Sequence, residues 1–248
     1  MQRLRHSLRK LFGRSPLDPH SAYQLWASTY DDAKDNALLF AEEQAMMPLL
    51  RGISLTGKQV LDAGCGTGRY LRELQEAHPN TIAALDFSDK MLERAKQKVS
   101  GAVPVSFHHT TLEHLPFPDS SFDVILCTLV LGHVRDLGGA IGELARVLRP
   151  GGEILLSDFH PFGQLLGWER TFRTSSTDGG KIYSVQYYGH LHSTYFTAFQ
   201  KHHLDIVSMR EPILDESLLP YYRKARREDI FEQYKGYPIL LIIHVRKK

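Results

Sequence analysis

The chain has 248 residues, of which 42% are hydrophobic and 23% are charged. A chain of this length and composition can bury a full hydrophobic core, which excludes a disordered protein and a small disulfide-dependent fold. Thirty basic against 28 acidic residues give a net charge of +2, which argues against a protein whose main partner is nucleic acid. The longest apolar run, Val124 to Leu131, is too short to cross a bilayer, which takes about 20 residues.

The first sixteen residues form a basic segment that contains no acid. Leu4, Leu8 and Leu11 recur at helical spacing, and Gly13 and Pro16 end the pattern. We therefore predict a basic amphipathic leader over residues 1–16. Three interpretations stay open: a helix on a membrane surface, a cleaved organelle-targeting leader, or a terminal helix packed on the body.

Residues 21–50 read as two helices, the first with Tyr23, Trp26 and Tyr30 on one stripe. Short apolar strands then alternate with helices. Strands are predicted at 59–63, 81–86, 105–109, 124–127 and 153–158, and helices at 68–77, 90–99 and 137–148. This alternation predicts an α/β fold with a doubly wound, Rossmann-like, seven-stranded and mostly parallel sheet, with helices on both faces.

The regular pattern stops at Asp158, and residues 159–193 are rich in Gly, Ser, Thr, Tyr and His. A helix at 194–201 and strands at 205–210 and 238–246 follow. We expect an insertion after the fifth strand that overhangs the ligand crevice, because ligands of this architecture bind at the carboxyl ends of the strands. The predicted single domain, 17–248, has a helical lid (17–54), a cofactor-binding core (55–158) and a substrate-side part (159–248).

Glycines at positions 64, 66 and 68 join the first strand to the first helix. Arg69 stands where a dinucleotide site needs its third glycine, and no Gly-Lys-Ser/Thr follows, so both nucleotide-phosphate patterns fail. Asp62, just before the turn, attracts an ammonium group, and Asp86, at the end of the second strand, suits ribose hydroxyls. A ligand with an ammonium and a carboxylate at one end and adenosine at the other fits these acids and exposed loop amides.

Four stretches carry a resemblance to a known family: VLDAGCGTGRYL at 60–71, LDFSDKMLERAK at 85–96, LPFPDSSFDVILC at 115–127 and LARVLRPGG at 144–152. In order and spacing the chain resembles the class I S-adenosylmethionine-dependent methyltransferases, in particular the small-molecule branch that is similar to ubiquinone and menaquinone biosynthesis and type 11 methyltransferases. The resemblance covers about residues 55–158 and implies S-adenosylmethionine as the cofactor.

The resemblance also implies a set of cofactor-binding residues. The methionyl end is expected near Asp62, Gly64, Cys65 and Gly66, the ribose at Asp86, and the adenine between Phe87 and Met91. Thr111 and Leu112 stand where the family often has an acidic residue followed by an adenine contact, and Leu112 offers its backbone amide. Cys127 is expected to present its carbonyl to the ammonium group, and Tyr30 belongs to the family's WA-x-x-YD lid.

The candidate catalytic residues are His133 and His160, which follow the fourth and fifth strands, where strand ends converge. Either is a candidate general base, although methyl transfer from a sulfonium depends on alignment and some acceptors need no base. The paired histidines lack carboxylates at helical spacing, and the two cysteines, Cys65 and Cys127, lie far apart, so we expect no metal ion. This cysteine usage is also typical of a reducing compartment, and we expect a cytoplasmic protein.

The expected acceptor is a small molecule. Base-methylating enzymes of this fold usually carry an Asp/Asn-Pro-Pro-Tyr/Phe run after the fourth strand, whereas this chain has CTLVLGH. No nucleic-acid partner is therefore expected. Two alternatives remain open: a non-catalytic cofactor-binding scaffold or assembly subunit, and a nucleic-acid or protein methyltransferase. The sequence indicates no oligomeric state.

Overall fold

The structure is a computed structural model that describes residues 16–31, 36–101, 103–175 and 180–248. The predicted leader, apart from its last residue, lies outside the described residues. Among the helices that are described, none combines the length and the apolar character needed to span a bilayer.

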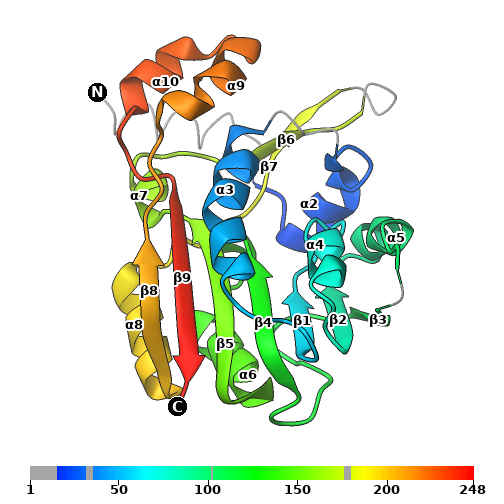
Figure 1. Cartoon of the computed structure of the whole chain (residues 1–248). Helices are drawn as coiled ribbons and strands as arrows, with labels where there is room; N and C mark the ends of the chain where they lie inside the picture. The colour runs from blue at the N-terminus through cyan, green and yellow to red at the C-terminus, as the bar shows by residue number, and fades with distance from the viewer. Residues whose placement is uncertain (1–15, 32–35, 102, 176–179) are drawn as a thin grey trace.

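A seven-stranded sheet forms the centre of the molecule, in the order β3-β2-β1-β4-β5-β9-β8 (Figure 1). The strands are β1 (Gln59–Ala63), β2 (Thr81–Asp86), β3 (Val105–His109), β4 (Phe122–Thr128), β5 (Leu148–Phe159), β8 (Leu204–Arg210) and β9 (Leu240–Lys247). The first five are parallel, and β9 is antiparallel to both β5 and β8. The predicted fold class is confirmed. β5 begins earlier than predicted, because the Pro-Gly-Gly run that ends the preceding helix lies inside the strand.

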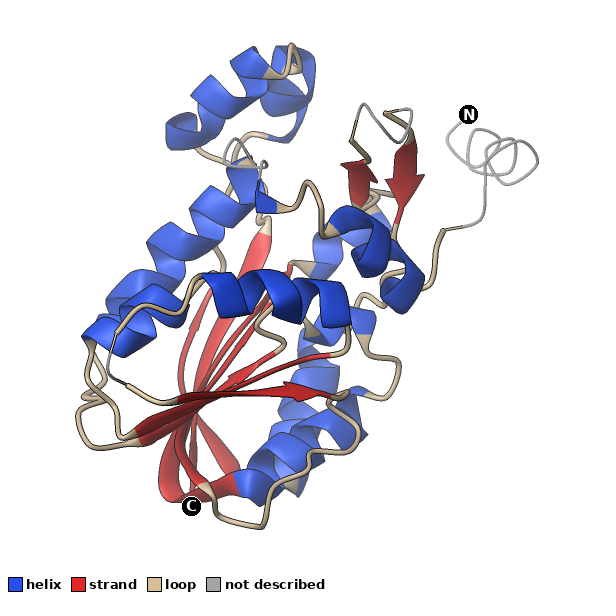
Figure 2. Ribbon diagram, turned by 90° about the vertical axis from the view of Figure 1, so that its right-hand side faces the viewer, coloured by secondary structure: helices blue, strands red, loops and turns tan. Residues whose placement is uncertain are grey.

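Helices cover both faces of the sheet, as the turned view shows (Figure 2). Alternate strand residues face opposite sides. Leu61 belongs to the apolar cluster that includes α6 (Leu137–Val147) and α8 (His192–Lys201), while Val60 belongs to the one that includes α3 (Ala37–Arg51) and α4 (Leu71–Glu76). α5 (Asp89–Gln97) lies on the same side as α3. The central strands are buried on both faces, which explains their nearly continuous apolar sequences.

Several elements lie beyond the carboxyl ends of the parallel strands, at the top of Figure 1. They are α2 (Pro19–Trp26), α7 (Pro161–Leu165), the hairpin of β6 (Thr171–Arg173) and β7 (Ile182–Ser184), α9 (Leu219–Lys224) and α10 (Glu228–Tyr234). The connections between these elements include the short 3-10 helices η2 (Leu131–His133) and η4 (Glu216–Leu218). The predicted lid helices are thus α2 and α3, and the predicted insertion contains α7 and the hairpin.

The segment before α2 is bonded to the hairpin. The amide of Leu17 donates to the carbonyl of Ser184 at 2.9 Å, and the amide of Gln186 donates to the carbonyl of Leu17 at 2.8 Å. α2 and the hairpin also share a small apolar core with α5, which includes Trp26, Phe172 and the fully buried Met91. The α2 region, which precedes the sheet in sequence, and the insertion after β5 therefore pack together over the edge of the sheet at which the parallel strands end.

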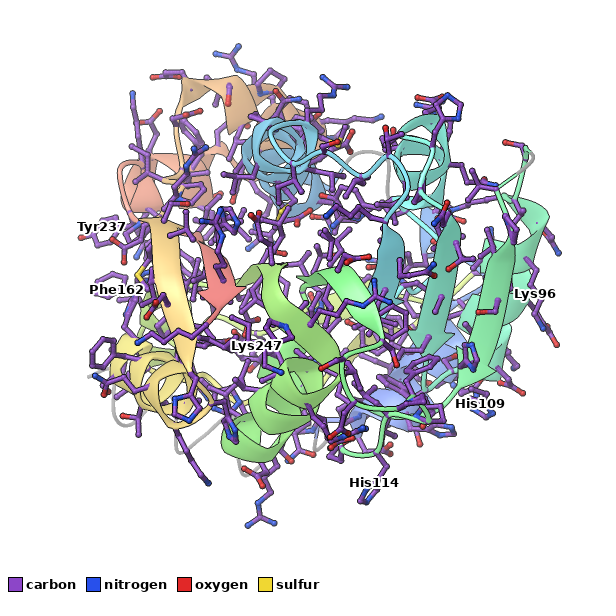
Figure 3. The ribbon with its side chains drawn as sticks, turned by 60° about the horizontal axis from the view of Figure 1, so that its bottom comes forward. Lys96, His109, His114, Phe162, Tyr237 and Lys247 are labelled. Carbon is purple, nitrogen blue, oxygen red and sulfur yellow. The ribbon has the colours of Figure 1, made fainter. Side chains whose placement is uncertain are left out.

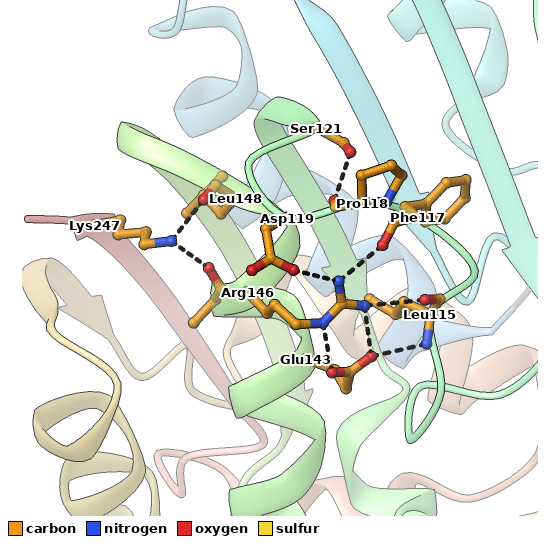
Figure 4. A network of polar contacts seen from close by, with 10 residues as sticks. Leu115, Phe117, Pro118, Asp119, Ser121, Glu143, Arg146, Leu148 and Lys247 are labelled. Atoms are coloured by element: carbon orange, nitrogen blue, oxygen red, sulfur yellow. Dashed lines mark hydrogen bonds and ion pairs between the residues drawn. The ribbon is translucent and has the colours of Figure 1, made fainter.

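A dense polar network holds the opposite, amino-terminal edge (Figure 4). Arg146, in the last turn of α6, donates to the carbonyl oxygens of Leu115 and Phe117, at 3.0 and 2.8 Å. Its guanidinium also donates twice to the carboxylate of Glu143, at 2.7 and 2.9 Å, and once to Asp119 at 2.8 Å. All three guanidinium nitrogens are used, and the loop before β4 is fixed to α6.

The last strand is fastened at the same edge. Lys247, labelled in the view that brings the bottom of the molecule forward (Figure 3), donates from Nζ to the carbonyls of Ala145 and Leu148, at 2.7 and 2.8 Å. A cation that meets the last carbonyls of α6 also interacts favourably with the helix dipole. The amino-terminal edge is thus closed by side chains that bond to backbone.

Candidate functional site

Asp62 is buried near the carboxyl end of β1, with 1% of its surface exposed. Its Oδ2 is a buried atom without a hydrogen-bond partner among the described residues. Burial raises the pKa of Asp62 to about 7; Arg69 opposes this shift, and Asp86 and Glu42 add to it. A buried carboxylate oxygen without a partner is costly, so this atom is suited to accept a hydrogen bond from a cationic ligand group.

Asp86 ends β2 and is also buried, with 6% of its surface exposed. Its Oδ2 accepts from the amide of Gly66 at 2.9 Å, and its Oδ1 accepts from the amide of Ser88 at 2.8 Å. Burial raises the pKa of Asp86 to about 6, and these two amides oppose the shift. Each carboxylate oxygen keeps acceptor capacity beyond one bond, which leaves room for the hydroxyls of a sugar.

The glycine turn has one closed and one open position. A Cβ at Gly64 would lie 2.3 Å from the side chain of Val130, so the loop after β4 packs directly against this residue. A Cβ at Gly66, where φ is +54°, would meet nothing within 4 Å, so the surface there is open to a ligand. The two glycines therefore meet different demands, tight packing at Gly64 and ligand approach at Gly66.

The expectation that exposed loop amides bind the ligand's carboxylate is wrong for three of them. The amides of Gly64 and Cys65 both donate to the carbonyl of Leu85 at 2.8 Å, and the amide of Gly66 donates to Asp86. These groups hold the turn against β2 because a sharp bend in a buried place must satisfy its own backbone.

Glu42, a fully buried acid of α3, was not among the residues predicted from the sequence. Its Oε2 accepts from the hydroxyl of Tyr70 at 2.7 Å and from the guanidinium of Arg69, and its Oε1 accepts from the hydroxyl of Ser157 at 2.7 Å. Glu42 thereby joins α3, the end of the glycine turn and β5. Its spacing is the signal that could have found it, because Glu42, Met46 and Leu50 lie four residues apart on the buried stripe of α3.

The predicted lid meets the glycine turn through Asp31. The Oδ1 of Asp31 accepts from the hydroxyl of Thr67 at 2.7 Å and from Nζ of Lys98 at 2.9 Å. Tyr30, next to it, is half-buried and packs edge-on against Trp26, with ring centroids 5.0 Å apart. The structure therefore brings Tyr30 to the neighbourhood of the turn, and its contact with a cofactor remains a prediction.

The other predicted cofactor residues lie in two kinds of place. Phe87 is half-buried beside Asp86, and its ring meets Tyr23 edge-on at 5.7 Å, while Thr111 is exposed after β3. The side chains of Leu112 and of Cys127, which lies inside β4 one residue before its end, are buried in the apolar core. Only the backbone of these two residues can therefore face a ligand. Burial also raises the pKa of the Cys65 and Cys127 thiols, which makes them poor nucleophiles.

His133 lies in η2, directly after β4, and both of its ring nitrogens are engaged. Nδ1 lies 3.0 Å from the carbonyl of Gln186, which can only accept, so Nδ1 carries the proton. Nε2 then accepts from the hydroxyl of Tyr23 at 2.9 Å. Burial, and next the positive charge of Arg170, lower the pKa of His133 to about 3, so the ring is neutral at physiological pH.

Tyr23 connects His133 to Arg170, whose Nε donates to the Tyr23 hydroxyl at 3.3 Å. Burial raises the pKa of Tyr23 to about 12. The sequence singled out Tyr23 only as part of the aromatic stripe, and it gave no sign of Arg170 because a lone arginine in a polar stretch is typical of the surface. The structure brings all three into one row above the ends of β2 and β4.

His160 has a different set of partners, so the two predicted histidines do not form one site. Its Nδ1 accepts from the amide of Phe162 at 3.2 Å, and its Nε2 therefore carries the proton and donates to Glu211 at 3.0 Å. Nε2 of His192 lies 2.8 Å from the same carboxylate. These three side chains place one ligand atom each within 4.8 Å of one another. A histidine that binds a metal through one ring nitrogen usually donates the N–H of its other ring nitrogen to a neighbouring group. In His160, Nδ1 accepts a hydrogen bond and Nε2 carries the proton, so the ring is not arranged as a metal ligand. The cluster therefore fits a hydrogen-bonded group.

A cavity of about 230 Å3 lies beside His160, lined by residues of α2, α3 and α7 and by residues 168–171, which lead into the hairpin. Its lining is partly aromatic and apolar: Trp26, Leu38, Phe159, Trp168 and Ile239. Its polar lining includes Arg170, Glu169, His160 and Tyr187. The hydroxyl of Tyr187 donates to the carbonyl of Phe159 at 2.9 Å, which holds this wall to the end of β5.

Residues 61–156 match a family model described as a methyltransferase domain. The chain is 38% identical over 140 residues to a malonyl-[acyl-carrier protein] O-methyltransferase of Serratia marcescens, and 32% identical over 139 residues to a demethylmenaquinone methyltransferase of Clavibacter sepedonicus. These matches cover 55% and 56% of this chain and 51% and 54% of the relatives. The chain thus spans about half the length of the curated relatives it matches.

A solved structure described as a putative S-adenosylmethionine-dependent methyltransferase from Listeria monocytogenes superposes with a TM-score of 0.66. It is 21% identical and covers 85% of this chain and 99% of its own. At this identity the likeness supports the fold alone. The fold therefore extends well beyond the matched core, to segments whose sequences differ.

Proposed function

We propose that this chain, whose core belongs to the class I S-adenosylmethionine-dependent methyltransferases, transfers a methyl group from S-adenosylmethionine to a small-molecule acceptor. The observation that carries the proposal is the pair of buried acids at adjacent strand ends, Asp62 with an oxygen that lacks a partner and Asp86 beside the open surface at Gly66. S-adenosylmethionine supplies a methyl group already activated on its sulfonium.

The residues present fit this cofactor. Asp62 would accept from its ammonium group, which explains why a carboxylate oxygen is kept buried without a partner. Asp86 would accept from the ribose hydroxyls while the amides of Gly66 and Ser88 hold it in place. Phe87, next along the chain, would present its ring to the adenine. Binding here is mainly positioning, which is what an in-line displacement requires.

A small acceptor is supported by the cavity beside Tyr23 and by the relatives. The cavity, of about 230 Å3, is lined by α2, by the start of α3, and by the end of β5 and the segments that follow it. The names of the two curated relatives describe methylation of an acyl-carrier-protein malonyl group and of demethylmenaquinone. Tyr23 packs against Phe87 and accepts a hydrogen bond from Arg170, which lines the cavity. Its hydrogen bond to His133 would orient the acceptor. The lid, core and substrate-side division of the chain is part of this proposal.

Calorimetry with S-adenosylmethionine tests the cofactor site first. We expect binding in the micromolar range that Asp86→Ala weakens by about a hundredfold, because a charge-assisted pair of hydrogen bonds is lost. Asp205→Ala, at an exposed position of β8, is the matched control and should bind as the native chain does. No heat with either the cofactor or S-adenosylhomocysteine would contradict the proposal.

The acceptor is tested with a methyl-labelled donor and a whole-cell extract, which contains small molecules, proteins and nucleic acids. We expect the label in small molecules. Label in protein or nucleic acid would favour the alternative acceptors, and cofactor binding without any transfer would favour a scaffold; both results contradict the proposal.

A further inference from the structure

Arg170 is a cation that the fold holds in place but does not pair. It directly precedes β6, and its carbonyl accepts from the amide of Val185 across the hairpin at 2.9 Å. Its guanidinium carbon lies 5.1 Å from the ring centroid of Trp26 and 4.4 Å from that of Phe159. These contacts fix the plane and the position of the group, because a guanidinium stacks on aromatic faces.

The hydrogen-bonding capacity of Arg170 is almost unused. A guanidinium has five N–H donors, and within the described parts of the chain only Nε makes a hydrogen bond, the one to Tyr23 at 3.3 Å. No carboxylate of the described residues lies within ion-pair distance of it. Arg170 is nevertheless half-buried, and it lines the cavity of about 230 Å3. A positioned fork of free donors beside a cavity is suited to a planar anion.

We propose that Arg170 binds a carboxylate group of the methyl acceptor. This inference rests on the proposed function and names the chemical class of its substrate. A carboxylate matches the guanidinium in geometry and charge, and the aromatic and apolar walls of Trp26, Phe159 and Trp168 suit a compact apolar body attached to it.

The charges around the cavity favour a carboxylate over a phosphate. Arg170 is the one lysine or arginine among the described residues that line it, and a dianion would need more positive charge. The acidic lining residue, Glu169, is exposed, so water and salt screen its effect on a bound anion. The Nε2 of His160 is engaged with Glu211, and the hydroxyl of Tyr187 donates to the carbonyl of Phe159.

The state of His133 agrees with an acceptor of this class. A carboxylate is already ionised at neutral pH, so its oxygen can form the new bond to the methyl carbon while the methyl–sulfur bond breaks and S-adenosylhomocysteine leaves. This displacement requires no general base. His133 has its proton on Nδ1, bonded to Gln186, and its Nε2 lone pair taken by Tyr23. Tyr23 and His133 are therefore positioning residues for Arg170 and for the acceptor that it binds.

The test divides a metabolite extract by anion exchange into an acidic pool and a neutral-plus-basic pool. Each pool is incubated with methyl-labelled S-adenosylmethionine and the full chain. We expect transfer from the acidic pool, and we expect Arg170→Gln to lower the initial rate at limiting acceptor by about a hundredfold, the loss typical of removing one partner of a buried ion pair. Arg170→Lys should recover part of the rate, because it restores the charge without the fork.

Three controls separate binding from folding. Arg210→Gln removes an equal charge from an exposed position of β8 and should keep the native rate. Cofactor affinity, measured by calorimetry, should be the same in all variants. Free guanidinium ion should raise the rate of Arg170→Ala and leave that of the native chain unchanged, which a purely structural role would not produce.

The outcomes also separate this inference from the proposed function. If methyl transfer occurs from the neutral-plus-basic pool and survives Arg170→Gln, the proposal that Arg170 binds a carboxylate is overturned, whereas the proposed methyltransferase activity stands. The carboxylate proposal is also overturned if Arg170→Gln loses its rate but neither Arg170→Lys nor free guanidinium ion added to Arg170→Ala recovers any of it. Cofactor binding without transfer from either pool would overturn the proposed function and the inference together.

Discussion

The two edges of the sheet each hold an arginine, and the two side chains differ in how many of their hydrogen-bond donors are used. At the amino-terminal edge, Arg146 donates to two backbone carbonyls and to the carboxylates of Glu143 and Asp119. At the carboxyl edge, Arg170 makes one hydrogen bond, to Tyr23. The contrast shows where this fold completes its own interactions and where it leaves them for another molecule. Asp62, with its unpaired Oδ2, lies at the same edge as Arg170.

The largest expected effect comes from Asp62→Asn. We expect affinity for S-adenosylmethionine to fall by about a hundredfold or more, because the ammonium group loses its buried counter-charge. The stability of the cofactor-free chain should not fall with it. The buried carboxyl has a pKa of about 7, above its unfolded value, so its contribution to stability is full below about pH 4 and is lost as the pH rises through 7.

Urea unfolding of the cofactor-free chains at pH 5 and pH 8 measures this second part. The native chain should lose more stability between the two pH values than Asp62→Asn does. If the variant keeps its cofactor affinity, or if unfolding depends equally on pH in both chains, Asp62 is not a buried carboxyl that the fold leaves for a ligand.

A smaller effect is expected from His133→Gln. Turnover should fall by about tenfold, the scale of a lost orienting hydrogen bond, while cofactor affinity stays the same. The pH–rate profile between pH 6 and 9 should keep its shape, because a histidine with a pKa of about 3 is neutral throughout that range. Steady-state rates against pH provide the measurement. A loss of a hundredfold together with a changed profile would instead identify His133 as a general base.

Arg146→Ala should have the smallest effect on activity and a clear effect on stability. Removing its bonds to the loop before β4 should lower the free energy of unfolding by roughly 1–3 kcal/mol, as expected for charged hydrogen bonds and an unpinned loop. Cofactor affinity should not change. Urea unfolding and calorimetry on the same sample test both parts. If Arg170→Gln destabilises the chain as much as Arg146→Ala does, the distinction between the two arginines fails.

The alternating core could be predicted because its signals are local. β1, β2 and β3 begin and end at the residues predicted from the sequence, between turn residues and helices. The hairpin of β6 and β7 was missed because each strand has three residues, and short polar strands carry no periodic signal. α9 and α10 were missed for a related reason, since both are short and mostly exposed.

The candidate site divides in the same way. Asp62, Asp86 and Gly66 follow from their places at strand ends, because the carboxyl ends of parallel strands meet at one edge. Arg170 and Tyr23 are 147 residues apart and meet only through the packing of α2 on the hairpin. His133 and Tyr23 are 110 residues apart in the sequence. Contacts between residues so far apart in the sequence produce no periodic pattern or motif from which they could be predicted.

Leu17 gives this edge a mechanical property. Because its amide and its carbonyl bond to either side of Val185, α2 is fastened to the hairpin that carries Arg170. Residues 17 and 184–186 therefore join α2 to the hairpin through two backbone hydrogen bonds. Trp26 of α2 and Arg170 both line the cavity, so these two hydrogen bonds fix two parts of its wall relative to each other.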